Sequence, residues 1–196
     1  MKSENLKKDF FDDCSKKWKE LKHCLNELVK EKIIPLLELK KGEKVLDACG
    51  GTGVLMPLLK TYGVFITEFD YSQHMIDKAR ELHGADAEYA VGNIEEMSFE
   101  SETFDKIICH NCLPHINSKE KAFNECARVL KKGGIFVISH DMGKKQVDDF
   151  HKKCHKAVCE DMMPSNKEIT LFACTAGFET VEIFDEENYF AVVCKK

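Results

Sequence analysis

A glycine-rich segment with an acidic residue near its start is the most informative stretch of this sequence. It reads VLDACGGTG and runs from Val45 to Gly53, with Gly50 and Gly51 inside it and Asp47 at the end of a short apolar run. Glycines in this arrangement let a ligand lie close against the backbone, because no side chain stands in the way. The carboxylate of Asp47 favours a cation over an anion at the end of the strand.

Three kinds of ligand bind to glycines that follow a strand, and the spacing of the residues separates them. A dinucleotide loop requires G-x-G-x-x-G, and here Met56 stands where the third glycine would be. A phosphate-binding P-loop requires Gly-Lys-Ser/Thr, and no lysine follows these glycines. Asp47 would also repel a phosphate. S-adenosylmethionine (SAM) carries an ammonium and a sulfonium but no phosphate. It therefore suits a glycine loop that lacks both phosphate-binding patterns and has a carboxylate at the end of the strand.

Polar side chains after the next two apolar runs fit the remainder of that molecule. Asp70, in the segment EFDYS, stands where a carboxylate binds ribose hydroxyls. Asn93, in VGNIEEM, offers an amide to the adenine edge, and Ile94 offers an apolar wall. Each feature also has a simpler interpretation: a tight turn at the glycines, a charge near a helix N-terminus at Asp70, and a turn-forming Asn93.

Short apolar runs alternate with amphipathic segments, which predicts strands alternating with helices. Strands are expected at 44–48, 64–69, 87–91, 104–109, 135–139, 179–184 and 189–194, and helices at 54–62, 72–83, 118–130, 144–159 and 165–176. The segment 185–188 is too short for a crossover, so the last two strands should pair antiparallel. We therefore expect an α/β fold with a doubly wound, mostly parallel seven-stranded sheet and an antiparallel C-terminal hairpin, with VLDACGGTG at the switch point.

The N-terminal segment has helical periodicity of its own. Phe10, Phe11 and Trp18 form an apolar stripe with no assigned partner in the sheet core. We expect this stripe to close over the pocket as a lid. The expected organisation is one domain over 1–196, with an N-terminal helical cap at 1–40 and the SAM-binding core at 41–196.

From about Lys44 to the C-terminus, these motifs resemble those of class I SAM-dependent methyltransferases with a Rossmann-like fold. The segments VLDACGGTG, FDYSQHM, GNIEEMSF with FDKII, and ARVLKKGGIFVIS follow one another in the family's order. The chain is similar to small stand-alone members of the ubiquinone/menaquinone-methyltransferase-like group, although that family usually has glycine where Cys49 stands. The resemblance implies a set of SAM-binding residues: Asp47, Cys49, Gly50, Gly51, Gly53, Asp70, Tyr71, Met75, Asn93, Ile94 and His110.

Histidines at the same edge of the sheet suggest chemistry on the acceptor side. His115 follows the fourth expected strand and His140 ends the fifth, while His151 and His155 are four apart on an expected helix and share a face. We predict that His115, His140 and His151 converge beside the methyl group of SAM. They would either hold a transition metal such as Zn²⁺ or supply a base, with His115 and His140 as the catalytic residues.

The expected function is methyl transfer from SAM to an O, N, S or C nucleophile of a small molecule. The chain has neither an N-P-P-Y type motif after the fourth strand nor an inserted domain for a large partner. The alternative is a non-catalytic SAM-binding protein, either a sensor or a partner subunit with the same fold. A NAD-dependent oxidoreductase is disfavoured by Met56 and by the antiparallel final pair.

Composition sets further expectations about partners and compartment. The formal net charge of −5 argues against nucleic acid as a partner. No apolar run approaches the roughly 20 residues of a membrane span, and the N-terminus has no secretory apolar region. The ten cysteines are then expected to be reduced thiols in the cytoplasm. Cys109 and Cys112 have the spacing of a redox or metal pair, but no second such pair completes a zinc site.

Overall fold

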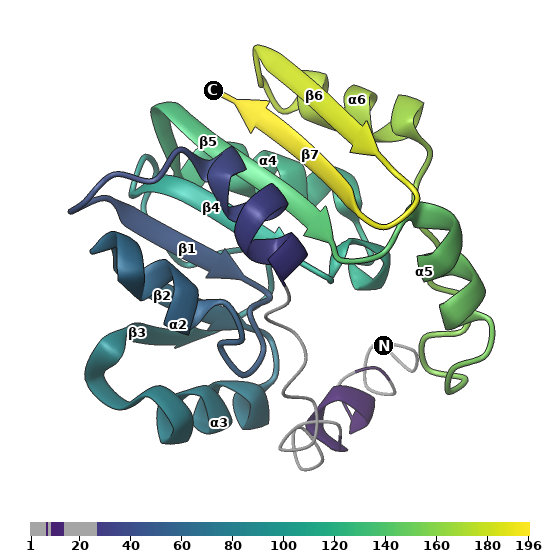
Figure 1. Cartoon of the computed structure of the whole chain (residues 1–196), viewed down its shortest axis with the longest axis horizontal. Coiled ribbons are helices and arrows are strands. Elements are labelled where there is room, and N and C mark those ends of the chain that lie inside the picture. Colours follow the sequence, from purple (N-terminus) through teal and green to yellow (C-terminus); the bar gives the residue numbers. More distant parts are fainter. Residues whose placement is uncertain (1–6, 8, 14–26) are drawn as a thin grey trace.

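Seven strands form one mixed sheet in the order β3-β2-β1-β4-β5-β7-β6 (Figure 1). The computed structural model describes residues 7, 9–13 and 27–196. The strands are β1 (Lys44–Ala48), β2 (Phe65–Asp70), β3 (Glu88–Val91), β4 (Phe104–His110), β5 (Leu130–His140), β6 (Thr180–Asp185) and β7 (Phe190–Lys195). Strands β1 to β5 pair in parallel, whereas β7 runs antiparallel between β5 and β6. The expected sheet, including its C-terminal hairpin, is confirmed.

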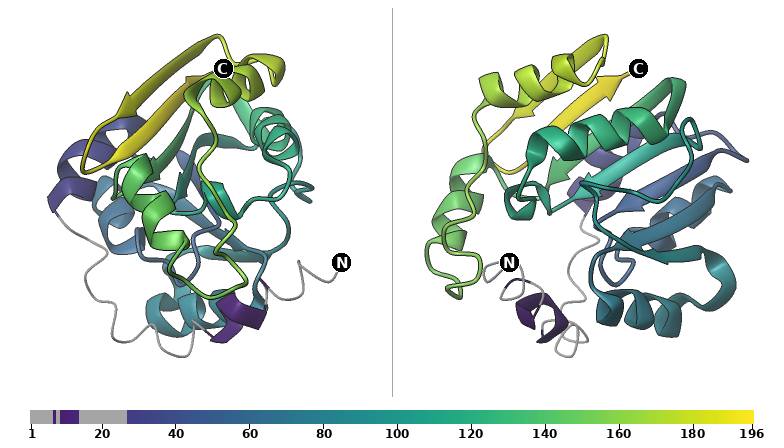
Figure 2. Two further views of the ribbon diagram at one scale, coloured as in Figure 1. Left: turned by 90° about the vertical axis from the view of Figure 1, so that its right-hand side faces the viewer. Right: turned by 180° about the vertical axis from the view of Figure 1, so that it is seen from behind.

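Helices cover the two faces of this sheet (Figures 1 and 2). The α-helices are α2 (Met56–Leu59), α3 (Gln73–His83), α4 (Lys119–Val129), α5 (Lys144–His151) and α6 (Asn166–Thr175). Shorter helical turns are η2 (Val29–Ile33), η3 (Ile34–Leu37), η4 (Lys60–Tyr62), η5 (Gly84–Asp86) and η6 (Leu113–His115). Side chains alternate between the faces of a strand, so Ile107 and Ile108 of β4 belong to different apolar cores. One core packs α4 and α6, and the other packs η2, η3 and α2.

Serine side chains form the N-caps of helices α3 and α6. Ser72 is the N-cap of α3, as expected, because its Oγ accepts a hydrogen bond from the backbone N–H of Met75 at 3.1 Å. Ser165 starts α6 in the same way and forms a capping box with Glu168. These bonds satisfy backbone donors that have no partner within the helix. They therefore fix where each helix begins.

Two boundaries differ from the sequence-based expectation. The strand expected at 135–139 begins earlier, at Leu130, and runs through Gly133 and Gly134, because Leu130 pairs with Phe104 of β4. The helix expected at 144–159 ends at His151. The chain then folds back on α5, where the N–H of Met163 donates to Asp148 Oδ1 at 2.9 Å.

The N-terminal region divides into two parts with different packing. Residues of η2 and η3, including Val29, Ile33 and Leu37, are fully buried in the core on one face of the sheet. They belong to the helical layer and not to a cap. The described residues before them, 7 and 9–13, are helical and lie beside the segment that follows α5 (Figure 2). Trp18 lies outside the described residues.

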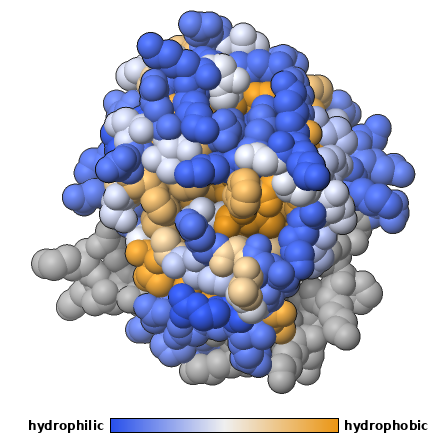
Figure 3. Space-filling view, turned by 90° about the vertical axis from the view of Figure 1, so that its left-hand side faces the viewer, coloured by the Kyte–Doolittle hydropathy of each residue, from blue (hydrophilic) through white to orange (hydrophobic). Residues whose placement is uncertain are grey.

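The surface carries both polar and apolar side chains. The face on the left of Figure 1 has apolar side chains across its middle, bordered by hydrophilic ones (Figure 3). Such a mixture is ordinary, because folded proteins do not have enough polar surface to cover themselves. Within residues 7, 9–13 and 27–196, no helix has both the length and the apolar character that crossing a bilayer requires.

Candidate functional site

The glycine loop after β1 turns over two buried acidic side chains. Cys49, Gly51 and Gly53 all have positive φ angles, of 60°, 63° and 75°. Gly50 has no room for a side chain, because a Cβ there would lie 1.7 Å from Glu68 Oε1 and 2.8 Å from Asp47 Cγ. The glycine at this position is therefore required by the carboxyl groups beneath it.

Asp47 and Glu68 are neighbours in the register of β1 and β2, and both are fully buried. Their four carboxyl oxygens have no hydrogen-bond partner among the residues that the structure describes. Burial, with Asp70 nearby, raises the pKa of Asp47 to about 8. Burial and the charges of Asp47 and Asp70 raise the pKa of Glu68 well above its usual value. Both acids therefore keep their protons to higher pH than solvent-exposed carboxylic acids do.

A cavity of about 490 Å³ opens beyond the carboxyl ends of β1, β2 and β4. Most of the predicted SAM-binding residues line it, namely Cys49, Gly50, Gly51, Asp70, Tyr71, Met75, Asn93, Ile94 and His110. Asp47 and Gly53 do not line the wall, because Asp47 points beneath Gly50 and Gly53 packs against His83. His83 of α3 is close to the glycine loop, because its Nε2 lies 3.2 Å from the carbonyl oxygen of Thr52. The cavity brings together residues that follow four strands, β1, β2, β3 and β4, and that are distant in the sequence.

Asp70 ends β2 and ties the glycine loop to the start of α3. Its Oδ2 accepts the backbone N–H of Gly51 at 3.1 Å, and its Oδ1 accepts that of Ser72 at 2.9 Å. Burial raises the pKa of Asp70 to about 6, although these hydrogen bonds act to lower it. The carboxylate is therefore mostly ionised at neutral pH and faces the cavity.

The loop after β3 forms another part of the wall. Asn93 Oδ1 accepts the backbone N–H of Glu95 at 3.0 Å, so Asn93 shapes a turn as well as lining the cavity. Glu95 Oε1 accepts the N–H groups of Asn117 and Ser118 at 3.0 and 2.9 Å. Ile94 is buried beside them. This network joins the loop after β3 to the N-terminus of α4.

His110 forms a neutral part of the cavity wall. Its Nδ1 lies 2.9 Å from Ser139 Oγ, and its Nε2 lies 3.2 Å from Asn111 Nδ2. Burial lowers the pKa of His110 to about 4, even though Asp141 acts to raise it. Both ring nitrogens are engaged, so His110 is suited to shaping the pocket and not to proton transfer.

His115 stands at the acceptor side of the cavity and is held by a carboxylate. Its Nδ1 lies 2.8 Å from Asp161 Oδ2, and Lys7 Nζ lies 2.6 Å from Asp161 Oδ1. Burial lowers the pKa of His115, with the Asp161 hydrogen bond acting against this effect. Burial acts to raise the pKa of Asp161, but hydrogen bonds from His115 and Lys7 hold it below its usual value. A neutral imidazole with Nδ1–H donated to Asp161 leaves Nε2 as an acceptor.

The predicted three-histidine metal site does not form. In the described part of the chain, Cys49, Cys109 and Cys112 are the only group of three His, Cys, Asp or Glu residues whose ligand atoms come together. His115 and His151 are neighbours, with ring centroids 4.8 Å apart, but Nδ1 of His151 is engaged by the carbonyl oxygen of Asp161 at 2.6 Å.

Two further parts of the histidine hypothesis also need correction. His140 is buried at the end of β5 and does not line the cavity, and burial lowers its pKa well below the usual value. His155 does not share a helix face with His151, because α5 ends at His151; instead, its ring stacks on Phe10 with centroids 5.4 Å apart. His115 is the predicted base that lines the cavity.

Sequence reasoning missed several polar residues at the site, namely Lys7, Glu68, Glu95, Asn111, Asn117 and Asp161. Glu68 was visible as a second acid in the strand before Asp70, but its contact with Gly50 depends on the register of β1 and β2. Asp161 reaches His115 from a segment 46 residues later. Neither partner could be found from local spacing.

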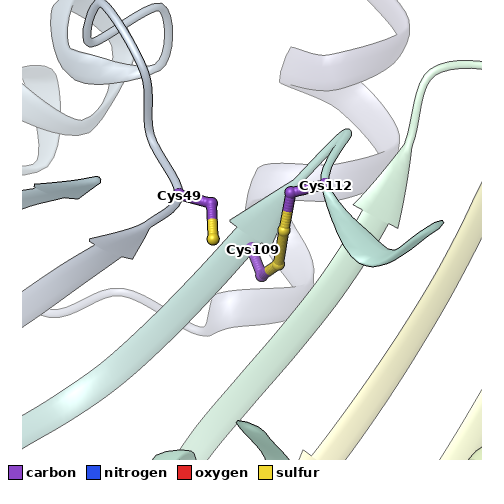
Figure 4. A group of neighbouring side chains, drawn as sticks. All are labelled: Cys49, Cys109 and Cys112. Atoms are coloured by element: carbon purple, nitrogen blue, oxygen red, sulfur yellow. A yellow bond between two sulfur atoms is a disulfide. The ribbon is translucent and has the colours of Figure 1, made fainter. Parts of the chain in front are cut away.

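The cysteines are not all free thiols. Cys109 and Cys112 form a disulfide, whereas all ten cysteines were expected to be reduced. Free cysteines among the described residues are Cys49, Cys126, Cys154, Cys159, Cys174 and Cys194. The sulfur of Cys49 lies close to the disulfide, beside the cavity (Figure 4).

The chain is similar to known methyltransferases in sequence. Residues 46–138 match the family model described as a methyltransferase domain. A ubiquinone biosynthesis O-methyltransferase of Coxiella burnetii is 31% identical over 102 residues, which are 50% of this chain and 44% of that relative. A ubiquinone/menaquinone biosynthesis C-methyltransferase of Methylococcus capsulatus is 28% identical over 191 residues, covering 82% of this chain and 77% of the relative. The chain thus spans less than half of the length of the first of these relatives.

A solved structure confirms the fold. A SAM-dependent methyltransferase described as putative, from Methanococcus maripaludis, superimposes with a TM-score of 0.76 at 19% identity, covering 96% of this chain and 93% of that one. Residues 46–138 thus match a methyltransferase domain, and the chain has the Rossmann-like fold of solved SAM-dependent methyltransferases.

The buried acids make a prediction about stability. Between about pH 4 and pH 8 folded Asp47 holds a proton that unfolded Asp47 releases, so the free energy of unfolding falls as the pH rises through this range. Asp47→Asn should therefore raise that free energy at pH 8 by on the order of 3 kcal/mol, with little effect near pH 4. Urea unfolding at pH 4, 6 and 8 measures the difference.

Asp105→Asn is the matched control, because hydrogen bonds from Lys131 and from the Lys44 backbone outweigh burial and hold the pKa of Asp105 below its usual value. Asp105→Asn should therefore lower the free energy of unfolding at pH 8. An Asp47→Asn variant that is less stable than the parent at pH 8 would contradict the account of the acidic pair.

Proposed function

We propose that this protein transfers a methyl group from SAM to a small-molecule nucleophile, with His115 as the general base. The observation that carries the proposal is the cavity, which places the glycine loop and Asp70 on one side and His115 on another. SAM supplies a methyl group activated by a positively charged sulfur. The protein's own residues bind, orient and desolvate the reactants.

The wall of the cavity fits SAM. Gly50 and Gly51 present backbone without side chains, so a ligand can lie against the loop. Asp70 presents a buried carboxylate for the ribose hydroxyls, and Asn93 with Ile94 offers an amide and an apolar surface for adenine. Asp47 would act from behind the loop, by supporting Gly50.

The acceptor would lie near His115. The rings of Phe11 and Tyr71 line the same cavity, and Phe11 packs edge-on against His115 with centroids 5.1 Å apart. Asp161 fixes the imidazole so that Nε2 can accept a proton from an acceptor hydroxyl, thiol, amine or acidic carbon. The relatives named for O- and C-methylation in quinone biosynthesis support a small-molecule acceptor.

The arrangement around His115 also bears on the non-catalytic alternative. A protein that only senses SAM has no need of a half-buried imidazole oriented by a carboxylate, with Lys7 bridging to that carboxylate. His115, Asp161 and Lys7 therefore favour an enzyme.

The proposed compartment is the cytoplasm, and the proposed partners do not include nucleic acid. Free thiols at Cys126, Cys154, Cys159 and Cys174 support a reducing compartment. The net charge of −5 argues against nucleic acid as a partner, because binding to a phosphate backbone depends on basic side chains.

Cofactor choice is tested by calorimetry. S-adenosylhomocysteine should bind far more tightly than NAD, and Asp70→Ala should weaken that binding by about 1–3 kcal/mol, the cost of a lost buried polar contact. Binding to the parent should also weaken as the pH falls through about 6, because Asp70 becomes protonated. Asp86→Ala, which removes a surface acid paired with Lys60, is the control and should change nothing. Equal affinity for NAD would refute the cofactor assignment.

The role of His115 is tested by titration and by turnover. NMR should show a pKa for His115 below 6.5, and Asp161→Asn should lower it further, because the carboxylate stabilises the protonated ring. The acid limb of the pH–rate profile should shift to lower pH in the same variant. With an acceptor found by screening phenols, thiols and amines, His115→Ala should slow S-adenosylhomocysteine formation by about 10²- to 10⁴-fold. Retained turnover in His115→Ala would rule out this base.

The segment 9–13 is proposed to act as a lid. Phe11 contacts both His115 and Tyr71, so Phe11→Ala should reduce turnover by about 2- to 12-fold, the equivalent of one lost aromatic contact. Asp9→Ala, at an exposed position of the same segment, is the control and should turn over like the parent. Equal rates for the two variants would show that the segment does not close the site.

A further inference from the structure

Three cysteine sulfurs meet at the wall of the cavity. Cys49 follows β1, Cys109 lies near the end of β4, and Cys112 directly precedes η6. Their Sγ atoms all lie within 4.8 Å of one another, and Cys109 and Cys112 are joined as a disulfide. Figure 4 shows the Cys49 side chain directed toward that disulfide from the neighbouring loop. The parallel pairing of β1 with β4 brings these segments together.

The backbone at Cys49 is one that a residue with a side chain seldom adopts. Its φ angle is 60°, in the left-handed region that glycine occupies without steric cost. A glycine would therefore suit this turn better than a cysteine. A disfavoured backbone conformation that keeps a side chain in a pocket points to a role for that side chain.

Two of the three cysteines face the cavity. Cys49 and Cys112 both line the cavity, while Cys109 is fully buried behind them. Asp70 and Glu95 line the same cavity, so its charge favours a cation.

We propose that Cys49, Cys109 and Cys112 form a three-sulfur binding site for a soft, thiophilic cation of low coordination number, Cu(I) in particular. Thiolates are the ligands that select Cu(I) over harder ions. The site forms when a dithiol reductant gives two electrons and two protons to the Cys109–Cys112 disulfide and is itself oxidised to a disulfide. Binding of the cation then displaces the thiol protons. This site does not depend on the proposed methyl transfer.

The test uses the full-length protein without SAM. Reduced protein, freed of reductant under anaerobic conditions, is titrated with Cu(I) supplied as its bathocuproine complex, and the loss of that complex reports the copper transferred. The same titration is run on oxidised protein with the Cys109–Cys112 disulfide intact. The reduced parent should take up one more equivalent of Cu(I) than the oxidised parent.

Variants show which sulfurs hold that equivalent. Cys49→Gly removes one sulfur and gives the loop the residue that its backbone favours, so the fold should be kept. Cys49→Gly and Cys112→Ser should each lose the extra equivalent, whereas Cys174→Ser, at an exposed position in α6, should keep it. Circular dichroism confirms folding of each variant.

Two results would overturn the proposal. The same uptake in Cys49→Gly as in the parent would show that Cys49 is not a ligand and that the site has two sulfurs at most. Equal uptake by the oxidised and reduced parent would show that Cys109 and Cys112 take no part. Neither result bears on SAM binding, which calorimetry measures separately.

Discussion

The glycine loop crosses directly over two buried carboxyl groups, and the rest of the site depends on this crossing. Asp47 and Glu68 occupy neighbouring positions on β1 and β2, and their side chains fill the space where Gly50 would carry a Cβ. The backbone therefore follows the end of the sheet closely, and the N–H of Gly50 donates to the carbonyl oxygen of Phe69 at 3.2 Å. Asp70 then fastens the loop by accepting the N–H of Gly51. The cost of burying two acids limits the stability of the fold and at the same time shapes the pocket.

The acceptor side of the cavity, around His115, is held together by contacts between side chains. Its parts come from segments distant in the sequence, since Lys7 lies near the N-terminus and Asp161 follows α5. They meet at His115 through charge-assisted hydrogen bonds, which orient the ring without a metal ligand set. The glycine loop is framed by the sheet, whereas this side also depends on the helical segment at 9–13.

Much of the fold could be predicted because its signals are local. Apolar runs marked each strand to within a few residues, and Ser72 identified the start of α3 through its capping hydrogen bond. Asp70 could be predicted as a site residue because it ends a strand at the switch point. His155 could not be placed, since the end of α5 is set by tertiary contacts such as that of Met163 with Asp148. The same holds for Glu68 and Asp161, whose partners are set by strand register and by long-range folding.

The central claim is that this cavity holds SAM with its ribose at Asp70 and its reactive sulfur toward His115. A crystal structure of the protein with S-adenosylhomocysteine tests it most directly. The account predicts ribose hydroxyls hydrogen-bonded to the Asp70 carboxylate, adenine against Ile94, and the sulfur facing the imidazole of His115. Electron density for the ligand outside this cavity, or a ribose that makes no contact with Asp70, would contradict it.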